Sequence, residues 1–390
     1  MEEHLLDKAM EIAARDLRWC YRERGIVSGS RKVYWSWDSY FASFGALSLG
    51  DTDIVRKNLE LYLALQRPDG ALPKRIAHPL YWMRFLGMPV TESSLFQRPT
   101  FSNSYFTDQC ITQNVIFPII FAEYIEQTGD RAFLALHYGR LVRSFSYLDK
   151  RRRKFGLLHE GVGGGWAESV LKRGAIAFTN MCYARAAQCM ANMASRLGEE
   201  GDAARFESLY KEVVESINTN LWSENGGAFY SDWLGTVRHH HFVTDGNLLA
   251  IWWGIASPAQ AQSIQDKIDE LHLEDEIPIK LAYDPYSWWR IYIFNRLGGI
   301  KDYHVGYSWT WLGCIDVLVK LQMGNHEQAL KVLTKIARVI VRDGCVHEAY
   351  DGDKWVQTFW YKSEHPWAWG AGIFLYACKA VGLALPSDAK

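Results

Sequence analysis

The sequence of 390 residues has no excess of charge of either sign. It contains 43 lysines and arginines against 44 aspartates and glutamates, which gives a formal net charge of -1. A chain without a net positive field has no general attraction for nucleic acid or for an anionic membrane surface. We therefore expect neither of these partners, and expect a small, neutral ligand instead.

Long apolar runs and paired cysteines are also missing. No apolar run reaches the roughly 18 residues that a membrane-spanning helix needs, and residues 1–25 are charged and amphipathic, unlike a secretory leader. The seven cysteines are scattered and include no CxxC pair, and the consecutive histidines 239–241 point in different directions without acidic partners. These features predict a soluble, cytoplasmic protein with reduced thiols, no metal and no cofactor, and they leave its oligomeric state open.

Aromatic side chains are what the sequence has in excess. They make up 14% of the residues and include 17 Trp and 20 Tyr. Trp and Tyr carry polar groups that are awkward to bury, so their number exceeds the needs of a core. The excess indicates a surface that binds sugar rings, and the plainer alternative is a large aromatic core.

Helical periodicity runs along most of the chain. It predicts about twelve helices, near residues 2–19, 38–49, 52–65, 109–127, 132–150, 181–197, 202–221, 248–254, 258–271, 312–323, 326–342 and 368–380. The helices come in pairs, and glycine-rich or aromatic stretches separate one pair from the next. We therefore predict an all-α fold, an (α/α)6 barrel of six helical hairpins that forms a single domain over residues 1–390, with the aromatic loops at one end.

Two acidic side chains lie in glycine-bracketed loops among tryptophans. Glu168 follows a run of glycines and Trp166, and Glu348 lies in the turn-rich segment 343–352, which an aromatic run follows. Glycoside hydrolysis requires one carboxyl group that donates a proton and another that stays ionised, in a site that aromatic faces help to dry. A solvated loop glutamate is the plainer interpretation of each residue, and one barrel mouth that gathers both favours an active site.

Two further stretches bear on such a site. Asp38 is interpreted equally well as a helix cap and as a carboxylate that grips sugar hydroxyls beside Trp35 and Trp37. The aromatic segment 77–108 contains three prolines and no clean periodicity. A loop of this length within a compact domain is usually functional, so we expect it to narrow the site and to favour a small substrate.

These residues give the sequence a resemblance to the inverting α-glycosidases on (α/α)6 barrels. It is similar above all to glycoside hydrolase family 63, with the amylo-α-1,6-glucosidase-like proteins, the mannosylglycerate and glucosylglycerate hydrolases and the alkaline invertases. The resemblance rests on four stretches in the right order: Trp37-Asp38-Ser39-Tyr40-Phe41; Asp69-Gly70-Ala71-Leu72-Pro73; Trp166-Ala167-Glu168-Ser169 with Lys172-Arg173-Gly174 and Thr179-Asn180; and Glu348-Ala349-Tyr350 followed by Trp367-Ala368-Trp369-Gly370.

The resemblance implies that Glu168 is the general acid and Glu348 the general base of an inverting hydrolase. Its substrate would be a small α-glucoside or α-mannoside, either a disaccharide or a glycoside with a small aglycone. Relatives generally place Asp where this sequence has Glu168, which leaves the sugar and the linkage open. The residues expected to bind substrate are Tyr34, Trp35, Trp37, Asp38, Gln109, Trp166, Lys172, Arg173, Tyr307, Trp309, Trp367 and Trp369.

Three other classes of protein remain as alternatives. An epimerase of the N-acylglucosamine 2-epimerase type would use a pair of histidines, for which His304 and His365 are the best candidates. A polysaccharide lyase would need a positive groove for uronates, which the balanced charge does not indicate. A carbohydrate-binding scaffold would keep the tryptophans without needing both Glu168 and Glu348.

Overall fold

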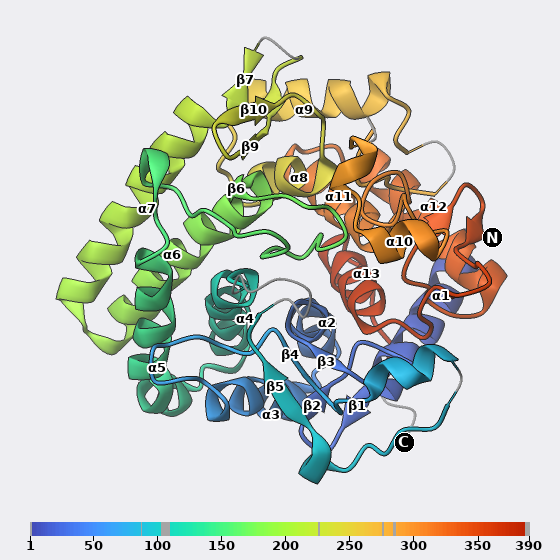
Figure 1. The fold of residues 1–390 in the computed structure, drawn as a ribbon, viewed down its shortest axis with the longest axis horizontal. Coiled ribbons are helices and arrows are strands. Elements are labelled where there is room, and N and C mark those ends of the chain that lie inside the picture. The colour runs from blue at the N-terminus through green and yellow to red at the C-terminus, as the bar shows by residue number, and fades with distance from the viewer. Residues whose placement is uncertain are drawn as a thin grey trace.

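A computed structural model of the chain describes residues 2–86, 88–102, 110–224, 227–274, 277–283 and 286–386. The fold that it shows is a barrel of two concentric rings of helices (Figure 1). The inner ring consists of α2 (Ser36–Ser48), α4 (Thr112–Thr128), α6 (Ala177–Leu197), α8 (Thr244–Trp252), α11 (Thr310–Gln322) and α13 (Ala368–Ala380). The outer ring consists of α1 (Glu2–Trp19), α3 (Thr52–Ala64), α5 (Arg131–Asp149), α7 (Glu200–Asn220), α9 (Pro258–Glu270) and α12 (His326–Asp343).

The contacts between helices close the inner ring. Helix α2 contacts α4, and the contacts continue through α6, α8, α11 and α13 back to α2. Each outer helix packs beside an inner helix that is its neighbour in sequence, and α1 also packs against α12 and α13. The predicted all-α fold and (α/α)6 barrel are therefore confirmed. The sequence analysis missed a short helix, α10 (Ile293–Leu297).

Burial follows from this arrangement. Every residue of α2 from Ser36 to Leu47 is buried, because the helix is enclosed on all sides. The outer helix α12 instead buries a stripe that includes Val332, Leu333, Ile336 and Ile340, at the spacing of one amphipathic face. A helix that is apolar all round is predicted to be internal, and an amphipathic one to lie at the surface.

Two inner helices approach so closely that only glycine fits between them. A Cβ atom on Gly45 of α2 would lie 2.3 Å from the carbonyl oxygen of Gly372 in α13. A Cβ atom on Gly372 would lie 2.6 Å from Cα of Ala42. The contact between α2 and α13 therefore depends on the absence of side chains at these two positions.

Side-chain caps begin three of the outer helices, α5, α9 and α12. Asp130 caps α5 by accepting from the N–H of Phe133 at 2.9 Å, and Ser257 opens α9 with a capping box. Asp38 does not act as a cap. It lies in the first turn of α2 without a capping bond, and its Oδ1 instead accepts from Nε1 of Trp367 at 2.8 Å. The interpretation of Asp38 as a helix cap is therefore wrong.

Short strands lie in the loops between the helices. They form five small antiparallel sheets, of which β3-β4-β5 and β10-β9-β6 have three strands each among the described residues. The strands are β1 (Tyr21–Arg22), β2 (Gly25–Ile26), β3 (Tyr34–Trp35), β4 (Arg75–Ala77), β5 (Arg98–Thr100), β6 (Gly174–Ala175), β7 (Trp222–Ser223), β8 (Phe229–Tyr230), β9 (Asp232–Leu234), β10 (Val237–His239), β11 (Tyr350–Asp351) and β12 (Lys354–Trp355).

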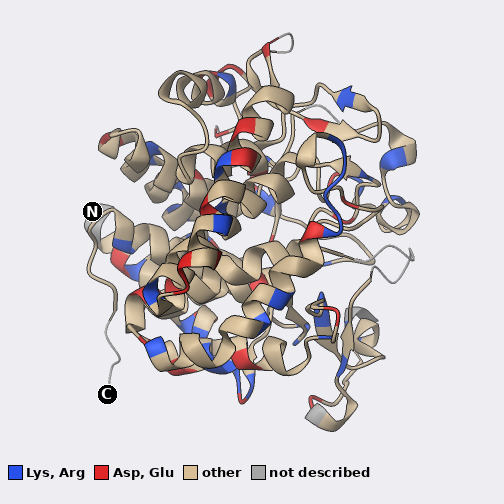
Figure 2. Ribbon diagram, turned by 90° about the vertical axis from the view of Figure 1, so that its left-hand side faces the viewer, with Lys and Arg blue, Asp and Glu red and all other residues tan. Residues whose placement is uncertain are grey.

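Charged residues of both signs are interspersed along the helices, as Figure 2 shows. None of the helices in the described residues combines the length and the hydrophobicity needed to cross a bilayer.

Candidate active site

One cavity of about 510 Å³ opens where the loops that precede the inner helices meet. Trp37 and Asp38 begin α2, and Trp166 and Glu168 come from the loop before α6. The segments before α2 and α4 add Arg31, Trp35, Tyr81 and Trp82, and the segments before α11 and α13 supply the rest of the wall. The wall residues are Arg31, Trp35, Trp37, Asp38, Tyr81, Trp82, Trp166, Glu168, Ser169, Tyr292, Phe294, Asn295, Gly298, Ile300, Tyr303, His304, Trp309, Glu348, Trp360, Tyr361, Glu364, Trp367 and Trp369.

Buried tryptophans form the floor of the cavity. The ring of Trp166 meets those of Trp309 and Trp369 edge to face, each with 5.6 Å between centroids. Its Nε1 donates to Oδ2 of Asp245 at 2.8 Å, which satisfies the one polar group of the indole. The floor is therefore a rigid aromatic surface, and Trp166 fixes the start of the loop that carries Glu168.

Glu168 lies against a buried lysine. Oε2 of Glu168 contacts Nζ of Lys74, whose side chain is only 1% exposed. The ammonium group also lies over the rings of Trp35 and Trp37, at 5.3 and 5.5 Å from their centroids. Next to Glu168, Oγ of Ser169 and Nδ1 of His304 are 2.8 Å apart, and burial lowers the pKa of His304 well below its usual value. His304 is therefore a neutral imidazole that holds the Glu168 loop.

Glu348 is held by hydrogen bonds from several donors. Tyr303 donates to Oε1, and Tyr361 donates to Oε2 at 2.5 Å. The backbone N–H of Glu364 donates to Oε2 at 3.2 Å, and Nη1 of Arg31 lies 3.6 Å from the same oxygen. Burial raises the pKa of both tyrosines well above the usual value, and the Glu348 charge adds to the effect. Both phenols therefore stay protonated donors, and donors of this kind stabilise an ionised carboxylate.

Two more carboxyl groups lie beside Glu348. Burial, and then the charges of Glu364 and Glu348, raise the pKa of Asp38 well above its usual value. Burial likewise raises the pKa of Glu364 to about 7, although Arg31 lowers it. Arg31 donates to Glu364 from its backbone N–H at 2.7 Å and from Nη1 at 3.4 Å. Glu348 and Glu364 thus share one guanidinium, and Asp38 lies on the same side of the cavity.

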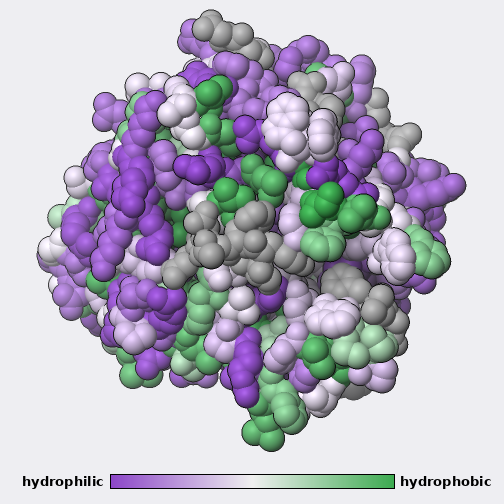
Figure 3. Space-filling view, viewed as in Figure 1, coloured by the Kyte–Doolittle hydropathy of each residue, from purple (hydrophilic) through white to green (hydrophobic). Residues whose placement is uncertain are grey.

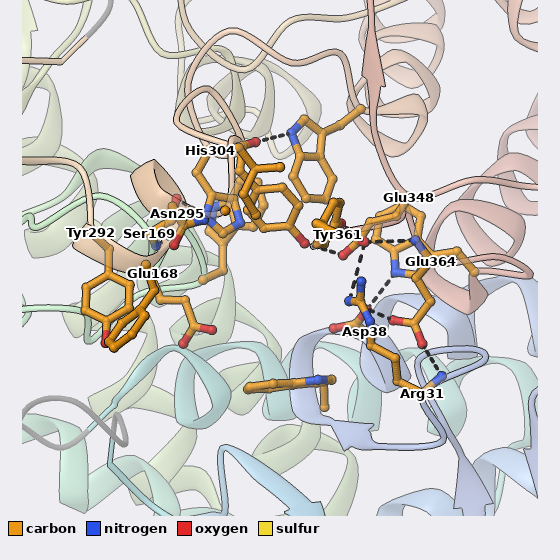
Figure 4. Close-up of a pocket in the computed structure, with 18 of the residues that line it drawn as sticks. Arg31, Asp38, Glu168, Ser169, Tyr292, Asn295, His304, Glu348, Tyr361 and Glu364 are labelled. Carbon is orange, nitrogen blue, oxygen red and sulfur yellow. Dashed lines mark hydrogen bonds and ion pairs between the residues drawn. The ribbon is translucent and has the colours of Figure 1, made fainter. Parts of the chain in front are cut away.

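The two predicted catalytic acids face each other across open space. Figure 4 shows Glu168 on one side of the pocket, with Ser169 and Asn295 on the same side. Asp38 and Glu348 lie on the other side, with Arg31 and Glu364 beside them. Such an arrangement can protonate a leaving group from one side and activate a nucleophile from the other.

The cavity wall includes nine of the fourteen residues that the sequence analysis predicted to be catalytic or to bind substrate. These are Trp35, Trp37, Asp38, Trp166, Glu168, Trp309, Glu348, Trp367 and Trp369. Tyr34, Lys172, Arg173 and Tyr307 do not lie on this wall, and Gln109 is outside the described residues. Three of the four motifs thus contribute residues to the cavity wall, whereas residues 69–73 contribute none.

Lys172 belongs instead to a second polar cluster behind Trp166. It is 6% exposed, and its Nζ lies 3.4 Å from Oδ2 of Asp232. Glu160 and Asp245 lie in the same cluster, and burial raises the pKa of Glu160 to about 7. The charge on Lys172 is therefore used within the protein, behind the floor of the cavity.

Sequence reasoning missed the residues that hold the two acids in place. Lys74, Arg31, Tyr303, Tyr361 and Glu364 were not named. Each of them lies close in sequence to a motif or to an aromatic loop, and this position is the one sequence feature that could have indicated a role in the site. Nothing in the sequence, however, indicates that Arg31 and Glu364 meet.

The histidines proposed for an epimerase do not meet in the cavity. His304 lines the wall, whereas His365 packs against His347, with 4.6 Å between ring centroids. Within the described ranges, no group of three or more His, Cys, Asp or Glu side chains could hold a metal ion. The geometry thus favours chemistry by carboxyl groups over deprotonation by paired histidines.

Two family models match different parts of the chain. Residues 32–170 match the mannosylglycerate hydrolase MGH1-like glycoside hydrolase domain, and residues 179–284 match trehalase. Human trehalase is 24% identical over 224 residues, which cover 54% of this chain and 36% of the trehalase. N,N'-diacetylchitobiose phosphorylase of Vibrio proteolyticus is 20% identical over 251 residues, covering 57% of this chain and 30% of the phosphorylase. The matches thus span about a third of these relatives.

Solved structures share the fold over almost the whole chain. The GH63 mannosylglycerate hydrolase of Thermus thermophilus, in complex with glucose, superimposes with a TM-score of 0.70 at 14% identity, covering 94% of this chain and 99% of that one. A rhamnosidase of Klebsiella oxytoca with rhamnose bound gives 0.71 at 14% identity, covering 97% and 64%. The resemblance to (α/α)6-barrel glycosidases is therefore confirmed.

Proposed function

We propose that this relative of the (α/α)6-barrel glycosidases is an inverting glycoside hydrolase. Its substrate is a small α-glucoside or α-mannoside, either a disaccharide or a glycoside with a small aglycone. The observation that carries the proposal is the placement of Glu168 and Glu348 on opposite sides of one aromatic cavity. Together they supply the acid and the base that the hydrolysis of an acetal requires.

Glu348 is the general base in this proposal. Its two oxygens accept from Tyr303 and Tyr361, and Arg31 lies beside Oε2, so that its negative charge is compensated. A carboxylate that accepts from these donors is held in one orientation, which the abstraction of a proton from water requires. Asp38 and Trp37 lie on the same side and bind the sugar from which the leaving group departs.

Glu168 is the general acid. Its side chain is 29% exposed, so it can take a proton from solvent between turnovers. Once Glu168 has protonated the glycosidic oxygen it carries a negative charge, and the adjacent ammonium of Lys74 stabilises that charge.

Inversion follows if a water molecule fits between Glu348 and the sugar. In inverting enzymes the two carboxyl groups are about 6.5–9.5 Å apart, whereas in retaining enzymes they are about 5 Å apart. The wider spacing is what the resemblance to inverting α-glycosidases implies for Glu168 and Glu348, which contact different partners, Lys74 and Arg31, on opposite sides of the pocket.

The size of the cavity favours a small substrate. A volume of about 510 Å³ lies within the range of about 300–1,000 Å³ that is typical of small-molecule sites. Tyr81 and Trp82, from the long segment 77–108, contribute to the wall and narrow the entrance. Starch and other long chains are therefore expected to be poorer substrates than disaccharides.

NMR of the first-formed product tests the proposal directly. Purified protein incubated with a panel of α-glucosides and α-mannosides should release the β-anomer before mutarotation. Glu348→Gln should abolish this release, and Glu212→Gln, a surface control on α7, should not. Initial formation of the α-anomer would exclude inversion, and release of a sugar phosphate only when phosphate is present would indicate a phosphorylase.

A further inference from the structure

The cavity changes character from its floor to its mouth. Asp38 and Glu348 are each 6% exposed, and Trp367 is 1% exposed. The wall residues Trp82, Phe294 and Trp360 are instead 50%, 62% and 60% exposed. A sugar held between the carboxyl groups therefore points its leaving group at the mouth, because buried tryptophans close the floor.

Glu168 is physically attached to one side of this mouth. The backbone oxygen of Ser169, its neighbour, accepts from the N–H of Tyr292 at 2.8 Å, and the N–H of Leu171 donates to the backbone oxygen of Arg290 at 2.6 Å. These bonds place Tyr292, Phe294 and Asn295 beside the acid, as Figure 4 shows for Tyr292 and Asn295. Since the acid must reach the glycosidic oxygen, the leaving group lies against this segment.

The other side of the mouth is joined to the same segment. Trp360 follows the β11–β12 hairpin, and Oγ1 of Thr358 donates to the backbone oxygen of Gly298 at 2.8 Å. The N–H of Thr358 also donates to the backbone oxygen of Tyr361 at 2.7 Å, which fixes the turn that carries Trp360. Phe294 and Trp360 thus belong to one connected apolar rim, and Figure 3 shows apolar side chains near α10 on this face.

Charge is distributed very differently from apolar surface. The charged residues on the described part of the wall are Arg31, Asp38, Glu168, Glu348 and Glu364. Arg31 lies 3.6 Å from Glu348 and 3.4 Å from Glu364, on the side away from the acid. Two cations lie close to the wall without lining it: the ammonium of Lys74 is buried against Glu168, and the guanidinium of Arg75 stacks on Trp35 and Tyr81. An anionic leaving group at the mouth would therefore meet the carboxyl of Glu168 and an apolar rim, and no cation among the described wall residues lies at this side of the cavity to balance its charge.

We infer that the leaving-group subsite binds an uncharged group with a flat apolar face and discriminates against an anionic one. A neutral sugar ring and an aryl ring share this chemistry, because each presents C–H or π surface that stacks on an exposed aromatic side chain. The inference rests on the proposed hydrolase function and specifies its aglycone. Trp360 is the specificity-determining residue at this subsite.

The first test compares leaving groups of different charge, among which glycerol and glycerate form a pair of nearly equal size. For the glycosyl unit that the enzyme accepts, kcat/KM is measured on the glycosyl-glycerol, the glycosyl-glycerate, the disaccharide, the aryl glycoside and the glycosyl fluoride. The neutral glycosyl-glycerol should exceed the anionic glycosyl-glycerate by about tenfold or more, which corresponds to an unbalanced partly buried charge. Equal or better turnover of the glycerate would overturn the inference.

The second test removes the aromatic side chain from the rim. Trp360→Ala should lower kcat/KM on the disaccharide and the aryl glycoside roughly five- to tenfold, mainly through KM. It should leave the glycosyl fluoride unaffected, because fluoride makes no use of the subsite. Trp289→Ala is the matched control, since Trp289 is 61% exposed and does not line the cavity.

The outcomes separate the inference from the function on which it rests. If none of the substrates, the fluoride included, is hydrolysed, the proposed hydrolase function is wrong. If all are hydrolysed and Trp360→Ala affects the fluoride as much as the disaccharide, the proposed hydrolase function is supported and the inferred leaving-group subsite is wrong. A loss on the disaccharide but not on the aryl glycoside identifies the neutral sugar ring as the preferred occupant.

Discussion

The phenol of Tyr361 donates to Oε2 of Glu348 across 2.5 Å, and the backbone N–H of Glu364 donates to the same oxygen at 3.2 Å. Tyr361 and Glu364 lie on the strand-like segment that returns after the β11–β12 hairpin, so a single turn of chain supplies both donors. The carboxylate proposed as the base is therefore positioned by its own loop.

Tyr361→Phe should lower kcat/KM by one to two orders of magnitude with little change in fold. A hydrogen bond to a charged group contributes about 1.5–3 kcal/mol, and here it aims the base. The comparison is with Tyr350→Phe, which removes a buried phenol bonded to Asp343 at 3.0 Å outside the cavity. Steady-state kinetics and thermal unfolding of both variants make the test, and equal activity losses would contradict a positioning role.

Glu168→Gln and Glu348→Gln should respond differently to the leaving group. An aryl glycoside with an acidic phenol needs no proton from the enzyme, so Glu168→Gln should spare it while slowing disaccharide hydrolysis about 10²–10⁴-fold. Glu348→Gln should slow both substrates alike, because water must be activated in each case. A similar response of both substrates to Glu168→Gln would assign the acid elsewhere.

Glu160→Gln should change how stability depends on pH. Burial raises the pKa of Glu160 from its ordinary value of 4.5 to about 7, so the folded protein keeps a proton there that the unfolded chain loses. This contribution to the free energy of unfolding is present below pH 4.5 and is lost as the pH rises to about 7. The loss amounts to about 3 kcal/mol at most.

The variant has no such proton to lose. Urea unfolding at pH 5 and pH 8 should therefore show a smaller decrease for Glu160→Gln than for the unmodified protein. Glu200→Gln, at the exposed start of α7, should follow the unmodified protein. An equal decrease in the free energy of unfolding for all three proteins would mean that Glu160 is ionised throughout this range.

Gly372→Ala should destabilise the barrel, whereas Gly139→Ala should not. The new methyl group at position 372 would overlap the backbone of Ala42 in α2, and overpacking of this kind costs about 1–3 kcal/mol. Gly139 lies on the exposed side of α5 with no atom within 4 Å of a Cβ, so alanine there should stabilise the helix by about 0.5–1 kcal/mol. Chemical denaturation of the two variants provides the comparison.

Most of the barrel could be predicted from the sequence, because each helix carries its own apolar pattern. The alternation of wholly buried helices such as α2 with amphipathic ones such as α12 is a local property of the chain. The short helix α10 was missed because five residues are too few to show a period.

The site could be predicted only in part. Asp38, Glu168 and Glu348 stood out because each lies beside tryptophans in a recognisable motif. Arg31 and Glu364 were missed because their hydrogen bond joins positions that are 333 residues apart. Lys172 shows the opposite error. It lies within a motif and was predicted to bind substrate, but its ion pair with Asp232 holds it behind the floor of the cavity.

The glycine contact between α2 and α13 joins the first and the last helices of the inner ring. During synthesis α2 leaves the ribosome hundreds of residues before its partner exists, with an apolar and glycine-lined face that nothing yet covers. Contacts of such long sequence separation form late and slowly. We therefore expect newly made chains to stay open and vulnerable to aggregation or chaperone capture until α13 emerges. The same helix that closes the ring also brings Trp367 to Asp38, so the site is completed only when the barrel closes.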